Sequence, residues 1–401
     1  MSADTPAVVL GAGVNGLGVA RSLKRADVSV WLLDTDASRP EMYTRAARPL
    51  AIRALHGDTL IEDLVRLGDT QFAGLRPVLF LTQEETVKTV SRHRDQLSAL
   101  YRLNLPPADV VDTLLRKQGF QRLAEDLGSP IPRLVHVRST ADLPALDGLH
   151  YPVVVKPDAR DEEYSRRFQK AYRVDNAVDA VALVRRILPI LPDIVAQEWI
   201  EGRDSDIYFC LQYVAGNGQL AASFTGRKIR SWPPQVGGTA SCTAAPEVHR
   251  ELTDITTRFF QAARVVGMAS MEYKRDARTH EFKMVEPTIG RTDYQQEVAT
   301  LNGINLPCVA WCSELGLPLP VPMASRRQVV WRVRSQDMQS ATAQAESLRE
   351  GYPQGARIAD ASWRWSDPRP HAMQSLQHLR RALRNRFSKL VPQSQAAGSK
   401  P

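Results

Sequence analysis

Three glycines near the start of the chain constrain its fold more than any other feature. Gly11, Gly13 and Gly16 form the pattern G-x-G-x-x-G directly after the short apolar run AVVL. Such a pattern leads a β-strand through a tight turn into a helix, because glycine lets the backbone bend and pack closely. A second apolar run follows and ends at Asp34. The N-terminus therefore predicts a βαβ unit of the kind that binds dinucleotides.

Strands and helices continue to alternate after this unit. Short apolar runs rich in Val and Leu occupy residues 7–10, 28–33 and 77–82, and segments of mixed polarity that suit helices separate them. This alternation predicts a parallel sheet covered by helices. Pro107 interrupts the pattern and marks the end of a first domain, residues 1–107.

The middle of the chain has a different organisation. YPVVVKPD and IVAQEWI have the composition of buried strands, the run DAVALVRRILPIL between them suits a helix, and further strand-like runs follow. Turn signals such as Gly216-Asn217-Gly218 join the later runs in pairs, which predicts antiparallel strands. The fold class is thus α/β followed by α+β. With 401 residues, the chain is long enough for two or three domains.

The charge distribution limits the expected partners. The net charge of +8 is concentrated at the C-terminus, where residues 326–401 carry fourteen Lys and Arg against five Asp and Glu. A nucleic-acid enzyme more often spreads positive charge over its body, so no nucleic-acid partner is expected. No apolar run reaches the ~18 residues of a membrane-spanning helix, and the N-terminus has no signal-peptide pattern. We therefore expect a cytoplasmic protein.

Lysines and carboxylates stand at the ends of the predicted central strands. Lys156 ends an apolar strand, Lys117 lies in a preceding helix, and Glu272 and Glu286 lie on two strands that are expected to pair. Lysines neutralise phosphate oxygens, and Mg²⁺ takes oxygen ligands from one or two carboxylates and from phosphates. Two lysines and two carboxylates in this order therefore predict a site for magnesium with a triphosphate.

The order and spacing of these segments resemble the ATP-grasp superfamily over residues 5–325. LAEDLGSPIPRLVHV, PVVVKP and VAQEWIEGRDSD resemble its first lysine helix, its second lysine strand and its adenine-binding hinge strand, and EPTIGR resembles its metal-binding strand. The resemblance implies a Rossmann-like pre-ATP-grasp domain followed by an ATP-grasp fold of two α+β subdomains. The implied divisions are 1–107, then 108–195 and 196–325, then a basic extension, 326–401.

The resemblance also implies a role for each matched residue, with ATP and Mg²⁺ or Mn²⁺ bound between the two subdomains. The residues implied to bind the nucleotide are Lys117, Lys156, Lys170, Gln197, Glu198, Ile200 and Asp204. Those implied to bind the metal are Glu272, Glu286 and Thr288, the last in place of the asparagine that is usual in the superfamily. Those implied to act in catalysis are Arg227, Lys228 and Arg291.

The implied activity is that of a carbon–nitrogen ligase (EC 6.3 type). ATP activates a small carboxylate as an acyl phosphate, and an amine then displaces the phosphate. Other ATP-grasp chemistry stays open at this point, either carboxylation or phosphorylation, including a reaction like that of carbamoyl phosphate synthase. An NAD-dependent oxidoreductase using the N-terminal glycines, and a protein that only senses nucleotide, also stay open.

Residues 371–391 predict a basic amphipathic helix. Apolar residues recur at intervals of three or four, and five Lys or Arg with no acid occupy other positions. The apolar positions are Met373, Leu376, Leu379, Leu383, Phe387 and Leu390. Such a helix can dock on its own protein or lie on an anionic membrane surface, so peripheral contact with the inner face of the membrane is a second expectation. The last nine residues are expected to be disordered.

Overall fold

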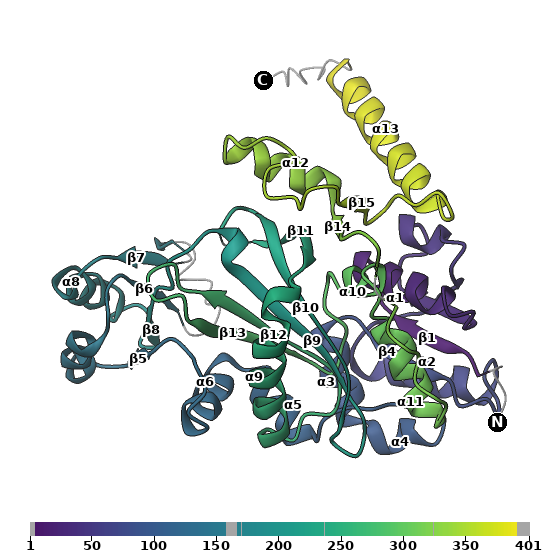
Figure 1. Cartoon of the computed structure of the whole chain (residues 1–401), viewed down its shortest axis with the longest axis horizontal. Coiled ribbons are helices and arrows are strands. Elements are labelled where there is room, and N and C mark those ends of the chain that lie inside the picture. Colours follow the sequence, from purple (N-terminus) through teal and green to yellow (C-terminus); the bar gives the residue numbers. More distant parts are fainter. Residues whose placement is uncertain (1–4, 158–166, 170, 236, 324, 391–401) are drawn as a thin grey trace, which may run out of the picture.

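The computed structural model describes residues 5–157, 167–169, 171–235, 237–323 and 325–390, with side chains described as far as Arg381. Three β-sheets follow one another along the chain. Figure 1 shows the second, smaller sheet at one end of the molecule, the N-terminal sheet at the other, and the large third sheet between them. The expected α/β domain followed by α+β units is confirmed.

The N-terminal sheet is parallel, as predicted, with strand order β3-β2-β1-β4. Its strands are β1 (Ala7–Leu10), β2 (Val30–Asp34), β3 (Arg48–Ala51) and β4 (Val78–Leu81). Its helices are α1 (Val14–Lys24), α2 (Gly57–Asp69), α3 (Glu84–Arg92) and α4 (Arg94–Ser98), and η1 (Pro40–Tyr43) is a 3₁₀ turn. A Cβ atom on Gly16 would lie 1.9 Å from the carbonyl oxygen of Gly11. The glycine pattern is therefore required by the close approach of α1 to the turn that precedes it.

The second sheet is antiparallel, with strand order β5-β8-β6-β7. Its elements are β5 (Leu134–Val137), η2 (Thr140–Gly148), β6 (Val153–Pro157), β7 (Tyr172–Val174), α8 (Ala177–Ile187) and β8 (Ile194–Glu198). Two helices, α5 (Ala108–Leu114) and α6 (Lys117–Asp126), precede it. The chain bends at Arg116, whose backbone is extended (φ −100°, ψ 129°).

The third sheet has seven strands in the order β13-β12-β9-β10-β11-β14-β15. Its strands are β9 (Ile207–Val214), β10 (Leu220–Trp232), β11 (Gly238–Ala244), β12 (Gly267–Arg275), β13 (Phe282–Ile289), β14 (Val329–Arg332) and β15 (Arg357–Asp360). The accompanying helical elements are η3 (Asp204–Asp206), η4 (Pro246–Val248), α9 (His249–Ala262), α10 (Glu297–Leu301), α11 (Leu306–Leu315) and α12 (Arg334–Ala343). β14 and β15 follow the predicted boundary at residue 326, yet they extend the sheet that β10 and β11 begin.

The predicted C-terminal helix is present as α13 (Arg369–Leu390). It contacts η1 near its beginning and then projects away from the rest of the chain (Figure 1). No helix in the described part of the chain is both long enough and apolar enough to span a bilayer. The expectation of disorder for the last nine residues concerns positions outside the described part of the chain.

Candidate active site

A cavity of about 420 Å³ lies between the second sheet and β13 of the large sheet. Its walls come from α5, α6, β5, β6, β8, β13 and the loop that follows β13. Six of the residues singled out from the sequence line this one cavity: Lys117, Lys156, Gln197, Glu286, Thr288 and Arg291. Residues that are up to 174 positions apart in sequence thus meet where the resemblance implied a nucleotide site.

The two lysines enter the cavity from different elements. Lys117 is the first residue of α6, and Lys156 lies near the end of β6. The Nζ atom of Lys156 donates a hydrogen bond to Oε1 of Gln197 at 3.0 Å. Gln197 lies on the neighbouring strand β8 opposite Val154, so it shares a face of the sheet with Lys156. The cavity therefore presents two cations that can neutralise phosphate oxygens.

The carboxylates of Glu272 and Glu286 come from directly opposed positions on β12 and β13. From β10, Lys228 reaches across β9 and places its Nζ atom 2.8 Å from Oε2 of Glu272. The side chain of Glu286 is exposed to the cavity, where desolvation by the surrounding protein raises its pKa, and the nearby carboxylates of Glu272 and Asp293 raise it further. Burial lowers the pKa of Lys228, but the charges of these same carboxylates outweigh that effect and raise it overall. The carboxylates of Glu272, Glu286 and Asp293 are therefore close enough to affect one another, and together they favour the binding of a cation.

Asp293 is a member of this group that the sequence analysis missed. One oxygen of its carboxylate accepts a hydrogen bond from Ser270 Oγ at 2.9 Å, and the other accepts one from the backbone N–H of Tyr294 at 2.8 Å. The only signal in the sequence is a carboxylate two residues after Arg291 in GRTDYQQE. Because that stretch forms a loop after β13, strand alternation could not indicate where its side chain points.

The donor set of this group suits a magnesium ion that also binds phosphate. Among the described residues, no three His, Cys, Asp or Glu side chains lie close enough together to hold a metal on their own. Mg²⁺ usually takes one or two carboxylates and completes its octahedron with substrate phosphates and water. Glu286 and Thr288 line the cavity, and the carboxylate of Glu272 comes from the position directly opposite Glu286 on β12. The residues present therefore fit a cation delivered together with a nucleotide.

Arg291 has an incompletely paired guanidinium group at this cavity. Its Nη1 atom donates to the carbonyl oxygen of Thr292 at 3.3 Å, while its buried Nε atom makes no hydrogen bond to a described residue. A buried donor without a partner is costly unless a ligand satisfies it. The position and charge of Arg291 therefore suit an anionic group on the bound substrates.

Asp204 and Glu198 serve other contacts, away from the cavity lining. Asp204 is buried, and its two oxygens accept hydrogen bonds from the backbone N–H groups of Ser231 at 3.0 Å and Gln235 at 2.8 Å. Glu198 accepts hydrogen bonds from the backbone N–H of His150 at 3.0 Å and from its Nδ1 atom at 2.8 Å. Asp204 thus anchors the loop between β10 and β11, and Glu198 ties β8 to the segment before β6.

Four further predicted residues also lie outside the cavity lining: Ile200, Arg227, Lys228 and Glu272. Ile200 is half-buried in the loop after β8. The Arg227 guanidinium donates to the carbonyl oxygen of Gly351 at 3.4 Å, whereas its neighbour Lys228 contacts Glu272. Lys170 lies outside the described residues.

Asp34, which resembled the ribose-binding acid of a dinucleotide site, is fully buried and already paired. Its carboxylate accepts a hydrogen bond from the backbone N–H of Ala12 at 2.7 Å and forms an ion pair with Arg39 Nε at 3.3 Å. A dinucleotide site of this type uses that acid to bind a ribose hydroxyl. In this chain the same carboxylate instead stabilises the glycine turn.

Comparison with known proteins identifies the fold. No family model and no curated protein matches the sequence, but the structure resembles many solved ones. N5-carboxyaminoimidazole synthetase from Staphylococcus aureus matches with a TM-score of 0.60 and 15% identity over 81% of each chain. N5-carboxyaminoimidazole ribonucleotide synthetase in its ADP complex matches with a TM-score of 0.61 and 14% identity over 85% of each chain.

A third similar structure is the biotin carboxylase domain of 2-oxoglutarate carboxylase from Hydrogenobacter thermophilus, in complex with MgADP, ADP and bicarbonate. It matches with a TM-score of 0.60 and 12% identity over 81% of this chain and 73% of its own. These matches extend over both the N-terminal domain and the two later sheets. The chain has the ATP-grasp fold, including the preceding Rossmann-like domain.

Proposed function

We propose that this protein is an ATP- and Mg²⁺-dependent ligase. It activates a small carboxylate as an acyl phosphate and joins it to an amine. The observation that carries this proposal is the one cavity that Lys117 of α6 and Lys156 of β6 line together with Glu286 and Thr288 of β13. Cations on one wall and metal-type oxygen ligands on the other are what a magnesium–triphosphate complex requires.

In this proposal, the cationic side chains bind phosphate groups and the anionic side chains bind the metal. Lys117 and Lys156 bind the phosphates, and Gln197 holds the Lys156 ammonium group in place. Glu272, Glu286 and Thr288 hold the metal, which supplies charge neutralisation when it is bound. Arg291 and Lys228 stabilise the negative charge that develops on the acyl phosphate.

The substrates in this proposal are two small molecules, a carboxylate and an amine. Bicarbonate is itself a small carboxylate, and it is present in one of the similar structures. Carboxylation is therefore the second candidate activity, and bicarbonate belongs among the acids that are tested. We place the protein in the cytoplasm, with peripheral contact to the inner face of the membrane through residues 371–391.

The first test is binding of Mg-ATP, measured by titration with a fluorescent ATP analogue. We expect saturable binding that ATP displaces and NADH does not. Lys156→Met removes one charge-assisted contact, usually worth about 1.5–3 kcal/mol, so the affinity should fall about 10- to 100-fold. Lys283→Met is a matched control, because Lys283 pairs with Glu281 outside the cavity.

Two results would contradict the proposal. Tighter binding of NADH than of ATP would support the oxidoreductase instead. ATP binding without ADP release, over a matrix of amines and acids that includes bicarbonate, would indicate a nucleotide sensor. Release of ADP that needs both an acid and an amine would support the ligase.

A further inference from the structure

A second cavity, of about 740 Å³, lies where α13 leaves the body of the protein. Its walls come from the end of α1, the residue Arg45, the strand β15 and the segment 363–367 that leads into α13. It shares no lining residue with the candidate active site. Six of its lining residues are Lys or Arg: Arg21, Lys24, Arg25, Arg45, Arg357 and Arg364.

The acids that line this cavity already have partners. Asp367 binds Arg21 Nε at 2.9 Å, and Glu297 binds Arg364 Nη2 at 2.8 Å. Asp360 binds Arg332 Nε at 2.7 Å. These pairs account for all three carboxylates of the cavity.

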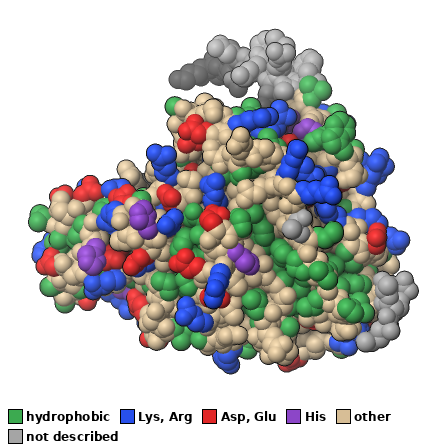
Figure 2. Space-filling model, viewed as in Figure 1, with side chains coloured by type: hydrophobic (Ala, Val, Ile, Leu, Met, Phe, Trp, Pro, Cys, Tyr) green, Lys and Arg blue, Asp and Glu red, His purple; other side chains and the backbone are tan. Residues whose placement is uncertain are grey.

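The other four cations have no acidic partner. Lys24, Arg25, Arg45 and Arg357 are exposed, and none of them forms an ion pair with another residue in the described part of the chain. Figure 2 shows Lys and Arg side chains gathered over the upper right of the visible face, next to α13. The cavity therefore has a local excess of four positive charges that the chain itself does not balance.

Exposed apolar side chains lie beside these cations. Trp365 lines the cavity with 88% of its surface exposed, and its ring packs edge-on against Trp363. Trp363 in turn packs against His371 in the first turn of α13. Farther along the helix, Leu376 and Leu379 are 39% and 57% exposed. An isolated exposed leucine is ordinary, but an almost fully exposed tryptophan in a basic cavity is unusual.

We propose that this cavity binds the phosphate-bearing headgroups of an anionic lipid bilayer, with Trp365 and α13 in the interfacial layer. Guanidinium groups bind phosphate well because their donors match its oxygens. Tryptophan is enriched at the headgroup level, where its ring meets both apolar and polar surroundings. A helix that is basic and partly apolar lies in the same layer. An acidic peptide or a nucleic acid would use the cations but would leave Leu376 and Leu379 exposed to water.

This assignment does not depend on the proposed ligase activity. α1, η1 and α13 fix the position of the cavity through contacts outside the candidate active site, such as the hydrogen bond from Gln377 Nε2 to the carbonyl oxygen of Ser38 at 2.6 Å. Binding to lipid can therefore be measured without nucleotide, and failure of the ligase proposal would leave the result intact.

The test is co-sedimentation of the full chain with vesicles of neutral phosphatidylcholine, with and without a third of phosphatidylglycerol. We expect binding to the anionic vesicles only, and weaker binding as the salt concentration rises. Each basic residue near such a surface contributes about fivefold in affinity. The double variant Lys24→Glu and Arg25→Glu should therefore bind at least about tenfold more weakly, and Trp365→Ala should also weaken binding.

The matched control is the double variant Arg185→Glu and Arg186→Glu. Both pairs are adjacent cations at the C-terminal end of an 11-residue helix, so the changes in net charge and in helix-terminus electrostatics are the same. This control should keep wild-type lipid binding. No sedimentation of the wild-type chain with anionic vesicles would overturn the proposal. Equal loss in both double variants, or capture by polyglutamate but not by vesicles, would also overturn it.

Discussion

Glu286→Gln is expected to abolish ATP turnover, by at least about a hundredfold, while the fold persists. Glu286 lines the cavity that holds both lysines, and it lies opposite Glu272 across the β12–β13 pair. The amide has the same shape but no charge, so it cannot balance a divalent cation beside triphosphate. The measurement is steady-state ADP release at saturating Mg²⁺.

Glu286→Gln is also expected to change how the melting temperature depends on pH, which the replacement of a merely structural residue would not do. Desolvation in the cavity wall and the neighbouring carboxylates raise the pKa of Glu286 in the folded chain. The unfolded chain therefore loses this proton at lower pH, and the native state is destabilised as pH rises through the folded pKa. Without metal, Glu286→Gln should melt at or above the wild-type temperature at neutral pH. The difference should vanish in acid, where both states of the wild type are protonated.

Glu281→Gln is the control for both measurements. Glu281 lies just before β13, is exposed like Glu286 but lies outside the cavity lining, and pairs with Lys283 at 2.9 Å. It should change neither turnover nor the pH dependence of melting. Near wild-type ADP release by Glu286→Gln would show that Glu286 is not a metal ligand. A large loss of thermal stability at neutral pH would show that it serves the fold instead.

For residues on regular strands, the sequence allows the face of the sheet to be predicted. Alternation along β6 and β8 puts Lys156 and Gln197 on one face. Glu272 and Glu286 meet because their strands pair, and the register shift of that pair begins only after Glu272. Strand periodicity fixes the face on which a side chain lies. The parallel N-terminal sheet likewise followed from apolar runs that alternate with helices.

Residues outside regular strands were not placed by the same reasoning. Asp204 lies in a 3₁₀ turn, and its partners Ser231 and Gln235 are close to it only because the large sheet folds them together. Contacts between distant segments leave no local pattern in the sequence.

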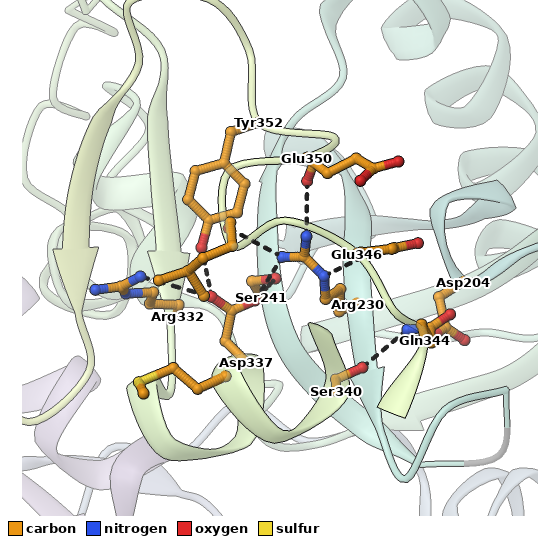
Figure 3. Close-up of polar contacts among 12 residues, drawn as sticks. Asp204, Arg230, Ser241, Arg332, Asp337, Ser340, Gln344, Glu346, Glu350 and Tyr352 are labelled. Atoms are coloured by element: carbon orange, nitrogen blue, oxygen red, sulfur yellow. Dashed lines mark hydrogen bonds and ion pairs between the residues drawn. The ribbon is translucent and has the colours of Figure 1, made fainter. Parts of the chain in front are cut away.

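The C-terminal part of the chain offers the clearest example of such a contact. Composition predicted a basic extension after residue 325, but a buried ionic cluster joins that part to β10 (Figure 3). Arg230 is fully buried and donates to Asp337 Oδ1 at 3.0 Å and to Glu346 Oε2 at 2.9 Å. It also donates to the carbonyl oxygens of Ser347 and Glu350.

Asp337 is the centre of this cluster. It is fully buried and accepts hydrogen bonds from Arg230, from Ser241 Oγ at 2.6 Å and from the Tyr352 hydroxyl, and Arg332 Nη1 lies 3.6 Å from its second oxygen. Burial, and the charge of Asp337 itself, raise the pKa of Tyr352, so its hydroxyl stays protonated and remains a donor. Figure 3 shows these groups converging on one carboxylate from β10, β11, β14 and the loop after α12.

Asp337→Ala should therefore destabilise the protein by about 3–5 kcal/mol, because it leaves a buried guanidinium without its main counter-charge. Glu346→Ala removes a partner of the same guanidinium, but Glu346 is 28% exposed and water can replace it. That control should cost about 1 kcal/mol or less.

The measurement is the urea midpoint at neutral pH, followed by far-UV circular dichroism and by tryptophan fluorescence. Trp331 on β14 is buried beside this region. An early fluorescence change with unchanged circular dichroism, present in the wild type and absent in Trp331→Phe, would show that the C-terminal strands detach first. Equal midpoints for the two variants would mean that Asp337 contributes no more than a surface ion pair.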